Sequence, residues 1–256
     1  MAVAKIGGRT QAMRVAESGS LRVRFPNAAG SALEAALVNT AGGVACGDAF
    51  AVEITAKDRA SLVVTTPAAE RIYRSDGLTA SYSVQLRLDA DTTTCWLPQE
   101  TILFDRARLR RRIEVDLSAQ ASLLVFEAIV FGRAARGESV NEGLLEDLWR
   151  IRRDGRLAYA DTFRMGGDIA SLLRKPVVAA GASAIATCLY IAPDAEARLE
   201  EARALLDGCA SECAASAWNG LLSIRFVASD VNTLRRDAVI FLSGFRQAPM
   251  PRVWLA

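Results

Sequence analysis

Two kinds of strand-like segment alternate through residues 1–165 of this chain. One kind alternates apolar and polar residues, which places the apolar side chains on one face of a strand. The other kind is a short and nearly continuous apolar run, which indicates a strand buried on both faces. The alternating segments are 51–55, 81–88 and 112–117, and the apolar runs are 61–64, 95–97 and 123–126.

The two kinds of segment follow one another in a recurring order. Each alternating segment ends in a small polar turn, and an apolar run follows the turn. The apolar runs begin near Ala60, Thr92 and Ala121, a spacing of roughly 30 residues, which lies in the range of solenoid repeats. This half of the chain has no helical pattern long enough for crossovers, so the pattern favours stacked β-hairpins over a βαβ sheet.

Helical patterns appear late in the chain. Residues 194–206 predict a helix closed by Gly208. After a predicted strand at 221–227, residues 230–242 predict a second helix, with Ser229 as its cap and Ser243-Gly244 as its end. The expected fold is therefore mainly β, with about two helices in the C-terminal third. No linker or charge block divides the sequence, which predicts one domain over residues 1–256.

An uncharged stretch runs from Pro176 to Pro193. It reaches the minimum length of a membrane span, about 18 residues. Glycine, serine and threonine dilute it, so two buried strands with a break near Gly181 are the better interpretation, and no membrane association is expected. The proline-rich tail cannot continue a helix, and we expect Trp254 to pack against the body of the protein.

The chain contains no histidine. This excludes Ser-His and Cys-His catalytic pairs, imidazole metal sites and histidine-rich metal storage. The five cysteines contain no CxxC pair, which argues against a disulfide framework or a zinc finger. Reduced thiols and the absence of a signal-peptide pattern at residues 1–16 favour a cytoplasmic location.

A net charge of +2 does not suggest a protein held to nucleic acid by bulk charge. The run from Arg106 to Arg112 could attract nucleic acid, but Glu114 and Asp116 follow it and favour a solvated strand face. A nucleic-acid binder that uses this run remains a third class of hypothesis, because it would need a contiguous basic face that the sequence cannot reveal.

Two segments with unusual loops contain candidate functional residues. Residues 39–48 hold three glycines in a turn that presents Asp48. The turn lacks the Lys-Ser/Thr and the helix of a phosphate loop, so a turn-capping carboxylate is the simpler role for Asp48. Residues 65–75 leave a buried strand and carry Glu70, Arg71 and Arg74, which form either a salt-bridge cluster or a surface for a partner.

Two further segments place carboxylates beside buried strands. Glu100 follows an apolar run, and hydrogen bonds to the backbone would explain it. Glu127 lies inside an apolar run, where an isolated carboxylate is costly, so it must be paired, protonated or exposed to a wet cavity. Arg133 is a candidate partner for Glu127. Carboxylate pairs also allow a hydrolase on a β-solenoid, using Asp48 with Glu127 or Glu138.

Taken in order, these segments resemble the UreD (also UreH) family of urease accessory proteins. The resemblance rests on a Gly-Gly-x-x-x-Gly-Asp turn, a Thr-Pro-x-Ala-x-Arg-x-Tyr-Arg-Ser segment, Trp-Leu-Pro-Gln-Glu, Glu-x-x-x-x-Gly-Arg followed by Gly-Glu, Asp-Thr-Phe-Arg and a closing Pro-Arg-Val-Trp. Each motif alone is weak, but the ordered set is specific and covers nearly the whole chain.

The resemblance implies a non-enzymatic scaffold with stacked sheets in a β-helix-like arrangement. It implies direct binding of UreF, recruitment of the GTPase UreG through UreF, binding of apo-urease, and a 2:2 assembly with UreF as one option. It also implies delivery of Ni²⁺ through an internal channel to a urease site with a carbamylated lysine. Nickel would be transient, with no tightly bound cofactor and no nucleic acid.

The family residues implicated in nickel transit match Asp48 and Glu127. Scattered carboxylates suit weak transit of a divalent ion better than a histidine or cysteine cage. Many relatives have a histidine and prolines where this chain has Asn39-Thr40-Ala41, and glycine where it has Cys46, a thiol that could bind nickel more tightly. The further candidates for lining the channel or contacting partners are Gly42, Gly43, Gly47, Glu70, Arg71, Tyr73, Arg74, Glu100, Arg133 and Glu138.

Overall fold

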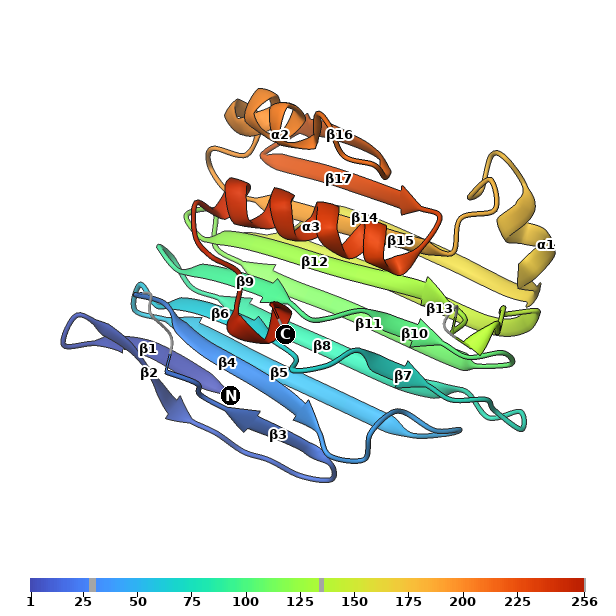
Figure 1. Cartoon of the computed structure of the whole chain (residues 1–256). Helices are drawn as coiled ribbons and strands as arrows, with labels where there is room; N and C mark the ends of the chain where they lie inside the picture. The colour runs from blue at the N-terminus through green and yellow to red at the C-terminus, as the bar shows by residue number, and fades with distance from the viewer. Residues whose placement is uncertain (28–30, 134–135, 256) are drawn as a thin grey trace.

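Two β-sheets face each other in the computed structural model, which describes residues 1–27, 31–133 and 136–255 (Figure 1). Ala256, the last residue of the expected domain, lies outside the described residues. The 7-stranded sheet A contains β1 (Ala2–Ile6), β2 (Arg9–Arg14), β5 (Ala49–Lys57), β8 (Ala80–Leu88), β11 (Arg108–Leu117), β13 (Glu142–Arg153) and β14 (Arg156–Asp168). The 10-stranded sheet B contains β3 (Leu21–Arg24), β4 (Leu33–Asn39), β6 (Ser61–Thr65), β7 (Glu70–Ile72), β9 (Thr93–Leu97), β10 (Thr101–Leu103), β12 (Ser122–Phe131), β15 (Ala184–Ile191), β16 (Glu212–Trp218) and β17 (Leu221–Ala228).

Consecutive strands of the central region lie in opposite sheets. The chain passes from β5 in sheet A to β6 in sheet B, from β8 to β9, and from β11 to β12. Each strand then pairs in parallel with the equivalent strand of the next turn, as β5 does with β8 and β8 with β11. The expectation of stacked hairpins was wrong, because a hairpin pairs neighbouring strands antiparallel. The β-helix-like arrangement is confirmed.

The predicted repeat appears as an aligned register. Ser61 pairs with Thr93, and Thr93 pairs with Ser122, so each apolar run begins at the same level of the stack. The turns that precede β6 and β9 contain Asp58 and Asp91 with φ of 52° and 60°. Aspartate tolerates this left-handed conformation better than most residues, which explains the small polar turns seen in the sequence.

The two strand patterns correspond to the two sheets. The central strands of sheet A place one face on the core and the other in solvent, which explains their alternation. Sheet B is covered on both faces, by sheet A on the inside and by helices on the outside. The helix α3 (Val231–Arg246) lies across this outer face in Figure 1. The apolar runs are therefore buried on both sides, as predicted.

The predicted late helices are present with different bounds. The first begins as a 3-10 turn (Glu196–Arg198) and continues as α2 (Leu199–Leu206). The second, α3, is capped by Asp230 rather than Ser229, since the Asp230 carboxylate accepts hydrogen bonds from the backbone amides of Asn232 and Thr233. It runs past Gly244, where a Cβ atom would lie 2.6 Å from Leu205 of α2. This glycine serves close helix packing and does not end the helix.

Two other expectations about the C-terminal half have different outcomes. Residues 176–193 contain one strand, β15 (Ala184–Ile191), rather than two. The residues before this strand form a turn that follows the unpredicted helix α1 (Ile169–Arg174). Among the described residues, no helix is long and apolar enough to cross a membrane. The tail packs as expected, through a 3-10 turn (Arg252–Trp254): the buried Trp254 indole donates to Thr65 Oγ1 and to the Leu97 carbonyl, both at 3.1 Å.

Candidate functional site

An arginine lies in the interior between the two sheets. Arg111 occupies an inward position of β11, between Leu109 and Ile113, and only 3% of it is exposed. Its Nε and Nη2 atoms donate to the two carboxylate oxygens of Asp147 at 2.9 and 2.6 Å. Its Nη1 atom forms an ion pair with Glu127 of β12. One guanidinium therefore joins two buried carboxylates, one from each sheet.

Glu127 is satisfied by Arg111 and by a tryptophan. The Trp96 indole donates to Glu127 Oε1 at 2.7 Å, and the carboxylate is 5% exposed. Burial raises the pKa of Glu127, and the nearby Asp147 charge adds to this, while Arg111 and Trp96 oppose it. The suggested pairing of Glu127 with Arg133 was wrong. Arg133, which follows the end of β12, is not the partner of Glu127. The partner is Arg111, which comes from the facing sheet.

Arg133 instead pairs with Glu138 at the end of the same strand. Its Nε and Nη2 atoms donate to Glu138 at 2.5 and 3.1 Å, and its guanidinium lies 4.0 Å from the centre of the Phe104 ring. The hydrogen bond from Arg133 lowers the pKa of Glu138. Both residues are partly exposed, so this pair orders a surface loop.

Further polar side chains continue from this cluster towards β14 and β17. Arg225 donates to Asp161 Oδ2 at 2.5 Å and to Thr187 Oγ1 at 2.8 Å. Burial alone would raise the pKa of Asp161, but the hydrogen bond and charge of Arg225 outweigh it and lower the pKa. Burial raises the pKa of Tyr159, which also contacts Asp161, to about 12. We call the set Arg111, Glu127, Asp147, Asp161, Thr187 and Arg225 the polar layer.

Two small cavities flank the Arg111–Glu127 pair. The edge cavity, of about 20 Å³, is lined by Arg111, Glu127, Asp147, Asp161 and Arg225 among others. The loop cavity, of about 30 Å³, is lined by Arg111 and Glu127 again, and by Glu70, Tyr82 and Thr101. Each has room for about one or two water molecules. Arg111 and Glu127 are the two residues that line both cavities.

The glycine turn is attached to the segment that carries Glu70. Asn39 Nδ2 donates to the Gly43 carbonyl at 2.9 Å and to Glu70 Oε1 at 3.0 Å, and Tyr73 donates to the Gly42 carbonyl at 3.0 Å. A Cβ atom on Gly43 would collide with the Tyr73 ring and lie 2.8 Å from the Arg71 carbonyl. The structure thus brings five of the candidate residues together, and burial raises the pKa of Glu70.

Asp48 lies apart from Glu127. Its carboxylate accepts a hydrogen bond from the Ala45 amide at 2.8 Å and so caps its own turn. It lines a separate surface cavity of about 400 Å³, whereas Glu127 lines the edge and loop cavities. Cys46, on the same turn as Gly47, contacts Ser75 Oγ at 3.1 Å, and this hydrogen bond lowers the pKa of the Cys46 thiol.

The other candidates lie in the loops around β7 and β10. Glu100 is buried and pairs with Arg235 of α3 at 3.0 Å, so it joins the helix to the sheet rather than bonding only to backbone. Arg71 and Arg74 are exposed, and within the described part of the chain neither forms an ion pair with Glu70. The proposed salt-bridge cluster is therefore absent there, and the two arginines remain available to a partner.

The basic run is largely neutralised by its neighbours. Arg110 pairs with Glu146 at 2.7 Å, Arg112 lies 3.7 Å from Glu114, and Arg111 points into the interior. A solvated strand face describes Arg110 and Arg112 but not Arg111. The run does not form the uncompensated basic face that nucleic-acid binding would need.

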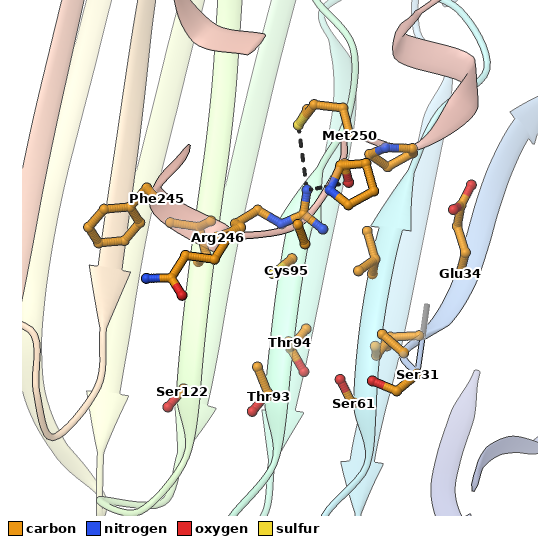
Figure 2. A pocket seen from close by; sticks show the side chains of 18 of the residues that line it. Ser31, Glu34, Ser61, Thr93, Thr94, Cys95, Ser122, Phe245, Arg246 and Met250 are labelled. Carbon is orange, nitrogen blue, oxygen red and sulfur yellow. Dashed lines mark hydrogen bonds between the residues drawn. The ribbon is translucent and has the colours of Figure 1, made fainter. Parts of the chain in front are cut away.

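A larger cavity than the two interior ones lies on the outer face of sheet B (Figure 2). This outer cleft, of about 870 Å³, has Ser61, Thr93 and Ser122 along its floor, and the Arg246 side chain extends over Cys95 towards Met250. Burial raises the pKa of the Cys95 thiol. The cleft offers hydroxyl groups, guanidinium groups and the carboxylates of Glu34 and Asp194, and within the described residues no three ligands in it are placed to hold a metal ion.

The carboxylates of the interior do not form a closed metal site. In the described ranges, no group of three histidine, cysteine, aspartate or glutamate residues is placed to hold a metal ion. Asp48 shares no cavity with Glu127 or Glu138, so the geometry does not provide the paired carboxylates of a glycoside hydrolase.

Sequence reasoning missed most of the polar layer. The run of arginines at 106–112 suggests a solvent-exposed Arg111, yet its spacing of two residues from both Leu109 and Ile113 places it on the apolar face of the strand. Asp147 shows the same signal between Leu145 and Trp149. Asp161 and Arg225 carry no such signal, because Asp161 is half-buried and Arg225 is exposed.

Comparison with known proteins gives one consistent family. The family model described as "UreD urease accessory protein" matches residues 1–255. A relative from Azorhizobium caulinodans is 58% identical over 254 residues, which cover 99% of this chain and 94% of the relative. A relative from Xanthobacter autotrophicus is 60% identical over 248 residues, which cover 97% of this chain and 86% of the relative. Both are named "Urease accessory protein UreD", a name for an accessory protein and not for an enzyme.

Proposed function

This chain belongs to the UreD family of urease accessory proteins, and from that premise we propose that it passes Ni²⁺ through its interior to apo-urease. The observation that carries the proposal is the polar layer between the sheets. Buried carboxylates from both sheets and two small cavities follow one another from Glu70 to Asp161. A mainly apolar core rarely contains such a set without a use for it, because burying charged groups is costly even when they are paired.

The proposed route avoids strong metal binding. Glu70, Glu127, Asp147 and Asp161 are oxygen ligands from separate positions, so a nickel ion would meet one or two at a time. Weak binding at several points allows an ion to enter and also to leave. Asp48 and Cys46, on a partly exposed turn, remain candidate contacts at the protein surface.

The partners in this proposal are UreF, bound directly, UreG, recruited through UreF, and the apo-urease subunits. An assembly of two chains with two UreF copies is one arrangement that fits. Exposed apolar side chains such as Val177 and Leu78 support a protein whose surface is covered in a complex. Five free thiols fit the reducing cytoplasm as the place of assembly.

The test is urease activation in cells that lack their own copy of this protein. Glu127→Gln and Asp161→Asn remove charge from the polar layer with little change in shape. We expect both to lower urease activity and the nickel content of urease, while UreF and urease subunits still co-purify. Asp116→Asn, an exposed position on the same strand as Arg111, is the matched control and should behave as the unmodified protein.

Full activation by both polar-layer variants would refute the internal route. Equal activation with and without the protein would refute the accessory role itself. Loss of co-purification by the two variants would point to a structural effect, and in that case the route would have to be abandoned as the explanation of their phenotype.

A further inference from the structure

On the proposed route an ion would have to pass Arg111, because this residue lines both small cavities. Both the edge cavity and the loop cavity are lined by Arg111 and Glu127, while their other lining residues differ. Arg111 reaches from sheet A, and its Nη1 atom contacts Glu127 and lies 3.4 Å from Thr101 Oγ1. The guanidinium therefore closes the polar layer at its most buried point.

The same guanidinium occupies the carboxylates that would hold a cation. Asp147 uses both of its oxygens to bind Arg111, and Glu127 uses one. A divalent ion between these two carboxylates would find its ligands engaged and a positive charge beside them. With Arg111 in place the ion would be repelled; with Arg111 moved away, two carboxylates balance the charge of one divalent ion.

Arg111 cannot yield by losing a proton, because a guanidinium stays charged in proteins. It must move, and a second carboxylate lies in its reach along the loop cavity. Glu70 lines that cavity together with Arg111, and Tyr82, the register partner of Arg111 on β8, lies there too. Asn39 Nδ2 donates to Glu70 Oε1 at 3.0 Å, and a carboxylate has further lone pairs that can accept a new hydrogen bond.

We propose that Arg111 is the gate of the passage: it holds Glu127 and Asp147 closed against metal ions, and it opens them by moving its guanidinium towards Glu70. This inference rests on the proposed nickel route and names what controls it. The gate keeps the resting protein from trapping a divalent ion, because the resident cation already satisfies both carboxylates.

The first experiment measures nickel binding to the full chain, kept soluble as a fusion, by equilibrium dialysis against NiCl₂. Arg111→Met removes the charge and keeps a long side chain. We expect Arg111→Met to bind one nickel ion about tenfold or more tightly than the unmodified chain, because two carboxylates lose their resident cation. Arg111→Met combined with Glu127→Gln should lose this gain.

Thermal unfolding with and without NiCl₂ guards against a variant that is merely unstable. Nickel should raise the Tm of Arg111→Met and leave that of the unmodified chain unchanged, because binding to the folded state alone stabilises it. If Arg111→Met does not fold even with nickel, the nickel affinity of Arg111→Lys tests the gate instead. Its point charge cannot bind Asp147 through two parallel bonds, and we expect nickel affinity to rise about threefold or more.

The outcomes separate the gate from the route. If the unmodified chain supports urease activation but no Arg111 variant binds nickel more tightly, the gate is refuted and the route stands. If Arg111→Met binds nickel tightly and also blocks activation, the gate is supported, since a trapped ion is not delivered. If Arg111→Met binds nickel tightly and activates urease fully, Arg111 does not control delivery and the gate is refuted.

Discussion

Arg111 and Asp147 are register partners on neighbouring parallel strands, and two parallel hydrogen bonds join the guanidinium of one to the carboxylate of the other. Both side chains therefore point inward at the same level of sheet A. The facing sheet supplies Glu127 to the same guanidinium. The polar layer is thus a product of strand register, since a shift of β11 by one residue would turn Arg111 out to solvent.

The stability of the protein should fall as pH rises through the raised pKa of Glu127. Between the unfolded-state pKa, near 4.5, and the higher folded-state pKa, the folded chain retains a proton that the unfolded chain has released. The contribution of this proton is complete below the unfolded-state pKa and declines above it. Glu127→Gln cannot titrate, so its urea midpoint should depend less on pH above the unfolded-state pKa of Glu127. Parallel pH profiles for the two proteins would contradict the raised pKa.

Trp254→Ala should lower the free energy of unfolding by about 3–5 kcal/mol. The indole is buried, lies 5.8 Å from the Phe126 ring centre and donates to two groups of sheet B. Urea denaturation measures the loss. Leu255→Ala is the control, because Leu255 is exposed and its truncation should change stability by no more than about 0.5 kcal/mol. Similar losses in both variants would show that the tail does not anchor through Trp254.

Gly43→Ala should destabilise the glycine turn more than Gly42→Ala does. Both glycines have positive φ, but only at Gly43 would a Cβ atom meet Tyr73 and the Arg71 carbonyl. We expect a loss of about 1–3 kcal/mol for Gly43→Ala beyond the cost shared with Gly42→Ala. The difference between their urea midpoints is the measurement, and equal midpoints would exclude the close approach.

Val177→Asp should leave folding unchanged and weaken complex formation. Val177 is 94% exposed in the turn after α1, so the substitution should alter the free energy of unfolding by no more than about 0.5 kcal/mol. A charge at an apolar contact point would lower the yield of urease subunits or UreF in co-purification. Lys175→Asp, nearby and already polar, is the comparison. If the yield of co-purified partners is unchanged with Val177→Asp, this turn is not part of the surface that binds them.

Cys46 should be alkylated faster than Cys188. The Ser75 hydrogen bond lowers the pKa of the Cys46 thiol, whereas burial raises that of Cys188 well above its usual range. Iodoacetamide labelling followed by mass spectrometry compares the two rates in the native protein. Ser75→Ala should slow the labelling of Cys46 and leave Cys188 unaffected; faster labelling of Cys188 would contradict the structure.

The sequence predicted the solenoid better than it predicted the connections. The alternating and apolar segments map onto sheets A and B because burial on one face or two leaves a direct pattern. The identity of the strand with which each strand pairs leaves no such pattern in the sequence, so parallel stacking of strands could not be distinguished from antiparallel hairpins. The end of α3 was missed for a related reason: Gly244 resembles a helix stop, but its absent side chain makes room for Leu205.

The candidate site was predicted in part. Glu127 stood out because a charge in an apolar run needs a partner, and the partner proved to be a residue of the opposite sheet. Contacts between sheets depend on tertiary packing, which a single sequence does not encode in any short pattern. Arg111 could have been found by continuing the strand alternation two residues towards the N-terminus from Ile113.

The aligned starts of β6, β9 and β12 have a consequence for how such chains can vary in length. A solenoid does not close on itself, so it can gain or lose one complete turn while every remaining strand still pairs in register with its neighbour. On the proposed nickel route, an added winding on one side of Arg111 would lengthen the path on that side by one strand spacing, about 4.8 Å, and leave the contacts of Arg111 unchanged.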